Sequence, residues 1–166
     1  MTDTMENLMN SIDANNKELQ NKYLTFWLDR QSFGVPIYQV VQIVSMQEIT
    51  PMPEMPYYVK GVINLRGNII PVIDGRLRLN KPETEYNDAT CIIITIMRGK
   101  YVGLIVDEVD EVKNIGKENI SDPPRVEGSG ESSVIGIARG ENKLTLIMDL
   151  DKVLGAGELA QITTGL

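Results

Sequence analysis

The sequence of 166 residues contains no histidine, one cysteine, one tryptophan and two phenylalanines. The absence of histidine excludes Ser-His-Asp and Cys-His nucleophilic sites, histidine metal ligands and the general base that most enzymes use near neutral pH. It also excludes a phosphorelay through a histidine of this chain. Paired carboxylates for glycosidic chemistry are disfavoured, because so few aromatic rings are available to bind sugars.

Motifs for phosphate or metal binding are also missing. The sequence has no GxxxxGK[ST] or GxGxxG loop. The acidic run 107–111 lacks the alternating ligand spacing and the glycine of a calcium loop, which favours a solvated face over a metal site. Cys91 cannot form an internal disulfide, and its apolar neighbours favour a buried small hydrophobe over a reactive thiol. We therefore expect no enzyme activity, no cofactor and no metal.

The chain has no apolar run of the 18 or more residues that would span a bilayer. Residues 1–20 are polar and lack the basic region and apolar core of a signal peptide, so we expect a flexible leader and a cytoplasmic protein without direct membrane insertion. The net charge of −7 disfavours nucleic acid and anionic lipid as partners. A charge of this size supports solubility and can steer the chain towards a basic patch on another protein.

Short apolar segments separated by Gly, Pro and polar residues predict many short strands, which is typical of an all-β fold with short helices. In addition, Asp151 is expected to cap a helix that runs to about Leu159. The predicted strands are Tyr23–Leu28, Ser32–Pro36, Val44–Ile49, Val59–Asn64, Ile69–Asp74, Thr90–Met97, Tyr101–Val106, Val112–Ile115, Ser133–Ala138 and Leu144–Met148.

An internal repeat runs through this pattern. An Arg-Gly turn at 66–67 lies between two apolar runs that close on Asp74, and a second Arg-Gly turn at 139–140 precedes an apolar run that closes on Asp149. Placing Gly34 on Gly103 aligns three apolar pairs without a gap: Ile37 with Val106, Val40 with Val109, and Ile43 with Val112.

The repeat predicts two small barrels of about five strands each, at residues 21–82 and 89–154. A C-terminal helix or tail is expected at 155–166. The polar, proline-containing segment 80–88 is the predicted link between the two halves. The sequence leaves open whether the first strand completes the first barrel or reaches across to the second.

Residues 51–74, PMPEMPYYVKGVINLRGNIIPVID, together with Gly34-Val35, closely resemble the CheW family of bacterial chemotaxis coupling proteins. The resemblance covers about Tyr23 to Leu154. It implies two five-stranded SH3-like β-barrels and a binding role in signal transduction without catalysis. It also implies two partners, the cytoplasmic domain of methyl-accepting chemoreceptors and the regulatory domain of the histidine kinase CheA, and recruitment to membrane-associated receptor arrays.

In this family the receptor binds a groove between the barrels. If an approximate two-fold axis relates the halves, the two aligned apolar stripes face each other, and an amphipathic receptor helix could lie between them. The alternative is that these side chains are simply barrel core. Gln42 stands where the family usually has an acidic residue. The expected receptor contacts are Leu24, Ile37, Val40, Gln42, Ile43, Val109 and Val112.

Arg66 is expected to be exposed in its hairpin turn, where packing does not demand arginine. A guanidinium group suits protein interfaces, and the resemblance favours a partner contact over a solvated turn residue. We expect Arg66 and Val126 to contact the kinase, although the sequence does not decide which partner Arg66 binds. The family commonly has a larger apolar residue at Val126 and leucine at Gly75.

Two other functions remain as alternatives. The same fold could serve as an adaptor in a chemosensory array with a different output, which the identity of the bound kinase would decide. A small hydrolase with acidic residues at a barrel mouth is the alternative from another class. The lack of histidine and of a phosphate-binding loop counts against it.

Overall fold

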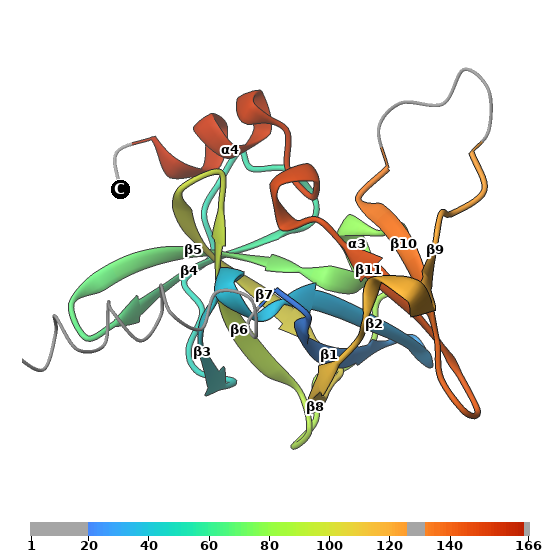
Figure 1. Cartoon of the computed structure of the whole chain (residues 1–166). Helices are drawn as coiled ribbons and strands as arrows, with labels where there is room; N and C mark the ends of the chain where they lie inside the picture. Colours follow the sequence, from blue (N-terminus) through green and yellow to red (C-terminus); the bar gives the residue numbers. More distant parts are fainter. Residues whose placement is uncertain (1–19, 126–131, 165–166) are drawn as a thin grey trace, which may run out of the picture.

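The computed structural model describes residues 20–125 and 132–164, which form a mostly β protein with two sheets (Figure 1). The strands are β1 Lys22–Leu28, β2 Gln31–Pro36, β3 Val40–Ser45, β4 Val59–Leu65, β5 Asn68–Asp74, β6 Cys91–Met97, β7 Lys100–Val106, β8 Glu108–Asn114, β9 Ile120–Ser121, β10 Val134–Arg139 and β11 Leu144–Met148. The helical segments are η1 Ile37–Gln39, α3 Gly75–Arg78, η2 Lys117–Asn119, η3 Leu150–Lys152 and α4 Ala156–Thr163.

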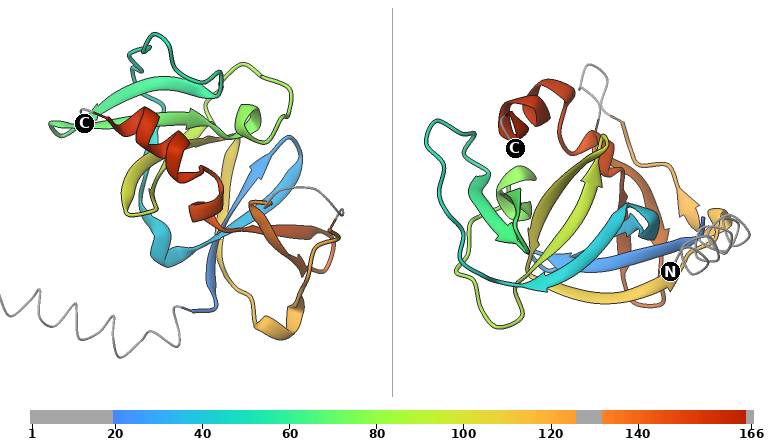
Figure 2. Two further views of the ribbon diagram at one scale, coloured as in Figure 1. Left: turned by 90° about the horizontal axis from the view of Figure 1, so that it is seen from above. Right: turned by 90° about the vertical axis from the view of Figure 1, so that its left-hand side faces the viewer.

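The two sheets exchange strands between the halves of the chain. The larger sheet has the order β8-β1-β2-β11-β10-β9, and the smaller sheet has the order β3-β6-β7-β5-β4. Thus β1 and β2 lie with strands of the second half, and β6 and β7 lie with strands of the first half, as the two views of Figure 2 show. Strand exchange, which the sequence left open, is therefore a feature of this fold.

The internal repeat accounts for this order. If β1, β2, β3, β4 and β5 are equated with β6, β7, β8, β10 and β11, each sheet order becomes the other, apart from β9. The registers agree as well. Gly34 lies opposite Ile147 in the parallel pair of β2 and β11, and Gly103 lies opposite Val72 in the parallel pair of β7 and β5. The bridge of Thr50 to β4 takes the place of β9.

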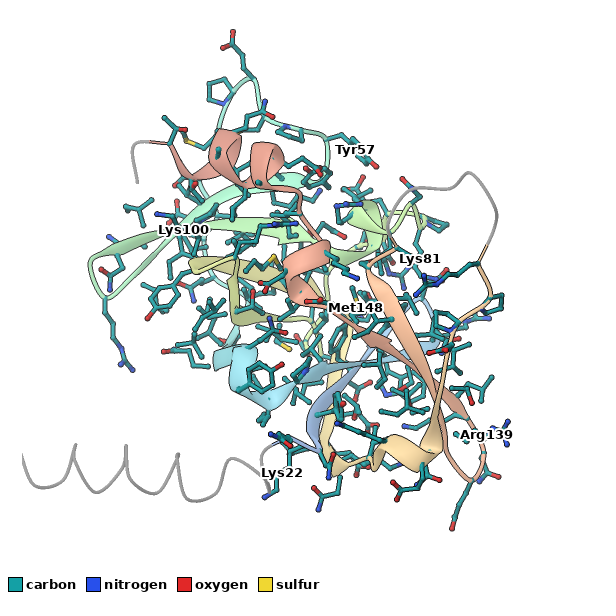
Figure 3. All side chains as sticks on the ribbon, turned by 45° about the horizontal axis from the view of Figure 1, so that its top comes forward. Lys22, Tyr57, Lys81, Lys100, Arg139 and Met148 are labelled. Carbon is teal, nitrogen blue, oxygen red and sulfur yellow. The ribbon has the colours of Figure 1, made fainter. Side chains whose placement is uncertain are left out.

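The main hydrophobic core lies between the two sheets. It joins Leu24 and Phe26 of the larger sheet to Ile93 and Leu104 of the smaller sheet, all at most 2% exposed. In Figure 3, Met148 of this core lies in the interior of the molecule, whereas Arg139 lies at its periphery. A second cluster packs on the other face of the smaller sheet: Ile63, Ile70, Val72, Ile92, Ile94 and Ile105. Burial of this apolar surface is the main force that holds the strands in place.

The prediction of a mostly β fold is confirmed, and the structure has two sheets, but three local predictions were wrong. The third strand is Val40–Ser45 and not Val44–Ile49, and the eighth is Glu108–Asn114 and not Val112–Ile115. Asp151 does not cap the terminal helix. Instead, the Gly155 amide at the start of α4 donates to Glu158 Oε1 at 3.2 Å.

The carboxylate of Asp151 has another partner, since it accepts a hydrogen bond from the backbone amide of Arg98 at 2.6 Å. The preceding helical turn, η3, is capped by Asp149, whose side chain accepts from the amide of Asp151. In the part of the chain that the structure describes, no helix has the length and apolar character needed to cross a membrane.

Candidate partner-binding site

The two strands that carry the predicted apolar stripes, β3 and β8, are both edge strands. Among the described residues, β3 pairs only with β6 and β8 only with β1. Both strands lie in the lower part of the molecule as drawn in Figure 1. An edge strand leaves one row of backbone groups unpaired, so it is the part of a sheet that is most accessible to another chain.

A bulge in β3 explains how apolar residues spaced by three share one face of a strand. Side chains three apart normally point to opposite faces, because a strand alternates with period two. Here Val40 lies opposite Thr95, and Ile43 lies opposite Ile93, so three steps on β3 match two steps on β6. The extra residue of the bulge turns both side chains to the face of Ile93, which belongs to the core between the sheets.

The second edge strand repeats this geometry. Val109 of β8 lies opposite Phe26, and Val112 lies opposite Leu24, again three steps against two. Because Phe26 and Leu24 are both core residues, Val109 and Val112 point to the same face of the larger sheet. The two stripes that the sequence aligned are therefore equivalent in register, and each points towards the face on which its sheet meets the other sheet.

The stripes run from the core to the surface. Val106 is fully buried, and Ile37, Val40 and Val109 are half-buried and pack against the core. The outer members are exposed, Ile43 to 45% and Val112 to 55%. Leu24 is only 2% exposed and packs in the core beneath the stripe, and its contact with a receptor stays a prediction. Ile43 and Val112 are the stripe residues best placed for contact.

Gln42 lies on a different face from the stripe. It is opposite Ile94, which belongs to the cluster on the far side of the smaller sheet, and its side chain is half-buried. The bulge therefore separates Gln42 from Val40 and Ile43. A partner that contacts both faces would have to wrap around the free edge of β3.

Cys91 connects the two edge strands. It begins β6 opposite Ser45 of β3, and it packs half-buried against the core between the sheets. Burial raises the pKa of the Cys91 thiol, and a hydrogen bond from the backbone of Val109 in β8 partly opposes this shift. The thiol therefore lies where the two walls of the site approach each other. Its partial exposure corrects the prediction of a buried residue.

Arg66 lies at the tip of the β4–β5 hairpin, in the smaller sheet but at the opposite edge from β3. It is exposed and has a left-handed φ of 53°, followed by Gly67 with φ of 90°, the pattern of a type I′ turn. The amide of Gly67 donates to Asn64 Oδ1 at 2.8 Å. The other expected kinase contact, Val126, lies outside the described residues.

A shallow pocket of 410 Å³ adjoins this turn. Two of its lining side chains are exposed apolar groups that sequence reasoning missed, Ile69 at 45% and Tyr101 at 53%. Tyr101 follows the β6–β7 turn, and only the pairing of β5 with β7 brings the two hairpins together. The pocket is lined by Gly67, Asn68, Ile69, Ile70, Pro71, Lys100, Tyr101 and Thr163.

Comparison with known proteins identifies the family of this fold. Residues 22–158 match the CheW-like domain. The chain belongs to the CheW family. Among similar CheW-family proteins, Chemotaxis protein CheW of Bacillus subtilis is 39% identical over 134 residues, which span 80% of this chain and 86% of the relative.

Other members of the CheW family are similar over comparable lengths. Chemotaxis protein CheW of Treponema pallidum is 30% identical over 148 residues, 86% of this chain and 87% of the relative. The crystal structure of the scaffolding protein TtCheW from Thermoanaerobacter tengcongensis superposes with a TM-score of 0.76 at 35% identity, and the match covers 84% of this chain and 95% of that one. The resemblance inferred from residues 51–74 is thus confirmed across both sheets.

Proposed function

We propose that this protein is a cytoplasmic scaffold that couples chemoreceptors to the histidine kinase CheA in membrane-associated receptor arrays, and thereby controls the activity of the kinase. Its membership of the CheW family supports this role, as do the names of its relatives as chemotaxis proteins and of its structural neighbour as a scaffolding protein. The protein would act by binding both partners at once and not by catalysis.

The observation that carries the proposal is the pair of bulged edge strands, each of which has an exposed apolar side chain at its outer end. Ile43 and Val112 together expose apolar surface at equivalent positions of the two sheets. The apolar face of an amphipathic receptor helix would bury this surface in a helix-in-groove interaction. Ile37, Val40 and Val109 would form the floor of the site, because they pack against the core.

The kinase would bind at the β4–β5 turn, through Arg66 and the apolar side chains of the neighbouring pocket. Ile69 and Tyr101 offer exposed apolar and aromatic surface there, and Arg66 can donate in a planar fork to a carboxylate or carbonyl group. This turn lies at the edge of the smaller sheet opposite to β3. The arrangement would leave both partners free to bind together.

Reconstitution with a receptor cytoplasmic fragment and CheA tests this role. We expect the receptor fragment to stimulate CheA autophosphorylation only when this protein is added, and the three components to co-sediment as one complex. Mixtures of this protein with the receptor fragment only, and with CheA only, provide the controls. Full stimulation of the kinase by receptor in the absence of this protein would refute the coupling function.

A further inference from the structure

A half-buried ion pair lies at the start of β8. The Asp107 carboxylate accepts hydrogen bonds from Arg76 Nε, at 2.9 Å to Oδ1 and 3.1 Å to Oδ2, and from Arg76 Nη2 at 2.6 Å. It also accepts one from the backbone amide of Asp29 at 2.8 Å. The Arg76 side chain is 17% exposed and that of Asp107 is 25% exposed. A bidentate pair that is shielded in this way fixes geometry far better than a surface ion pair.

The ion pair sits where the chain passes from one sheet to the other. Asp107 is the single residue between β7 of the smaller sheet and β8 of the larger sheet. Its own amide donates to the carbonyl of Trp27 in β1 at 3.0 Å. Arg76 belongs to α3, which follows β5. The carboxylate therefore ties α3, the β1–β2 turn and the start of β8 to one point, two residues before Val109.

Gly75 allows α3 to reach this point. A Cβ at this position would lie 2.7 Å from the carbonyl oxygen of Ile105 in β7 and 3.1 Å from Leu28 Cδ1 in β1. Any side chain would push α3 away from both strands and carry Arg76 with it. Glycine at position 75 thus fits the close approach of α3 to these two strands.

Within residues 20–125 and 132–164, no ion pair of this kind holds the other edge strand. The repeat that equates Gly34 with Gly103 places Tyr38 at the position of Asp107, just before β3. Tyr38 lies in η1 and is 64% exposed. A neutral, exposed tyrosine cannot form an equivalent ion pair. The two walls of the candidate site are alike in register but are held in different ways.

We propose that Arg76 and Asp107 are positioning residues that fix the β8 wall of the partner-binding site, whereas the β3 wall is free to adjust to the bound helix. The inference rests on the proposed receptor site but concerns residues that do not touch the receptor. Loss of the ion pair would loosen the segment that leads to Val109 and Val112. Val109 and Val112 would then adopt many conformations in the free protein. Binding would become weaker, because the receptor would have to select one of these conformations.

A double-mutant cycle tests the assignment, with a receptor cytoplasmic fragment as the titrated probe. We expect Arg76→Ala to weaken binding by about three- to tenfold, and Val112→Ala to cost less in the Arg76→Ala background than in the wild type. Ile43→Ala is the matched control on the other wall, and its effect should add to that of Arg76→Ala. Equal additivity in both cycles, or wild-type affinity of Arg76→Ala, would overturn the proposal.

A measurement without a partner separates this inference from the proposed function. In Arg76→Ala, amide hydrogen exchange should become faster across Glu108–Asn114 and stay unchanged across Val40–Ser45. Arg76→Lys keeps the charge but not the fork, so it should recover part of the affinity and serve in place of a poorly folding alanine variant. Wild-type binding of both Ile43→Ala and Val112→Ala would refute the receptor site, while unchanged exchange in β8 would refute the anchor itself.

Discussion

The hydroxyl group of Thr25 in β1 bonds to both backbone groups of Glu111 in β8, donating to its carbonyl oxygen at 3.0 Å and accepting from its amide at 3.2 Å. Glu111 lies within the β8 bulge, where regular pairing with β1 is interrupted. The buried side chain of Thr25 therefore replaces the missing ladder bonds. The repeat places Ile94 at the equivalent position of β6. Isoleucine has no hydroxyl group, so it cannot form such hydrogen bonds to the backbone of the β3 bulge.

Thr25→Val tests the role of this hydroxyl group in holding the bulge. Valine keeps the shape of threonine but leaves the amide and carbonyl of Glu111 without their partner, so we expect a loss of about 1–3 kcal/mol in unfolding free energy. Thr25→Ser, which keeps the hydroxyl and loses the methyl group, is the control and should retain the hydrogen bonds. Urea denaturation measures both. A valine variant more stable than the serine variant would contradict the assignment.

Ile43→Asp and Val112→Asp should abolish most receptor binding while leaving the fold intact. Both side chains are already 45% and 55% exposed, so a charge there stays hydrated in the free protein and is desolvated only when a partner covers it. We expect a loss of about 2–5 kcal/mol in binding free energy. Leu144→Asp is the matched control, because Leu144 is 54% exposed on β11. An equal loss of binding in all three variants would argue against a specific site.

Arg66→Gly should weaken partner binding without loss of stability. Arg66 adopts a left-handed φ of 53°, which costs an ordinary residue about 1 kcal/mol and glycine almost nothing. The glycine variant should thus unfold at or above the wild-type denaturant midpoint, yet bind CheA with an affinity lower by more than about 1 kcal/mol. Arg66→Lys should recover part of this loss. Titrations with both CheA and the receptor fragment reveal which partner the arginine serves, and wild-type affinity for both would assign it to a solvated turn.

The carboxylate of Glu158 should make the docking of α4 sensitive to acid. The hydroxyl of Tyr58 donates to Glu158 Oε2 at 2.5 Å and is the main cause of the lowered pKa of Glu158. A carboxylate with a lower pKa in the folded state contributes its stability above the unfolded pKa of about 4.3, and this contribution disappears as the pH falls through the folded pKa. The difference in unfolding free energy between wild type and Glu158→Gln should be constant from about pH 6 to 8, where the carboxylate is charged in both the folded and the unfolded state. It should shrink towards about pH 3, as the carboxylate becomes protonated.

The control for this experiment is Glu141→Gln, on the exposed turn between β10 and β11. Thermal unfolding monitored by circular dichroism across the pH range supplies the measurement. A difference between wild type and Glu158→Gln that stays the same in acid would show that the charge of Glu158 does not contribute to docking of α4.

Gly61→Ala should be far more damaging than Gly67→Ala, although both glycines have a positive φ. A Cβ at Gly61 would lie 2.0 Å from the carbonyl oxygen of Thr50, whose backbone pairs with Val62. At Gly67 a Cβ would meet no atom within 4 Å, so only the backbone strain of about 1 kcal/mol remains. We expect Gly61→Ala to cost several times more in unfolding free energy, or about 3 kcal/mol and above. Similar losses in the two variants would contradict this account.

The sequence was sufficient to predict most strands and the alignment of the two stripes, because apolar runs and turn residues act locally. It could not predict which sheet each strand joins. Pairs such as Phe26 with Val109 lie far apart in the chain, and nothing near either residue encodes the contact. The boundaries of β3 and β8 were misplaced for a related reason. A bulge breaks the alternation of apolar and polar residues, so the pattern no longer marks the strand.

The candidate site was predicted unevenly for physical reasons that individual residues illustrate. Ile43 shares a face of β3 with Val40, and Val112 shares a face of β8 with Val109, because in each strand a bulge compensates the spacing of three residues. Leu24 has the same apolar character but points into the core, and composition alone cannot separate the two cases. Asp149 and Asp151 are equally good capping residues in isolation, and only the contact with Arg98 distinguishes them.

The exchange of strands means that neither half of the chain contains a complete sheet. A chain of half the length that contained only β1–β5 would lack β11, the partner of β2, and β7, the partner of β5. Only the equivalent strands of a second copy could take their places. Two such copies would form a two-fold symmetric, domain-swapped homodimer. The present protein has the architecture of that dimer joined into a single polypeptide, which allows its two halves to diverge, as an anchored β8 and an unanchored β3 already have.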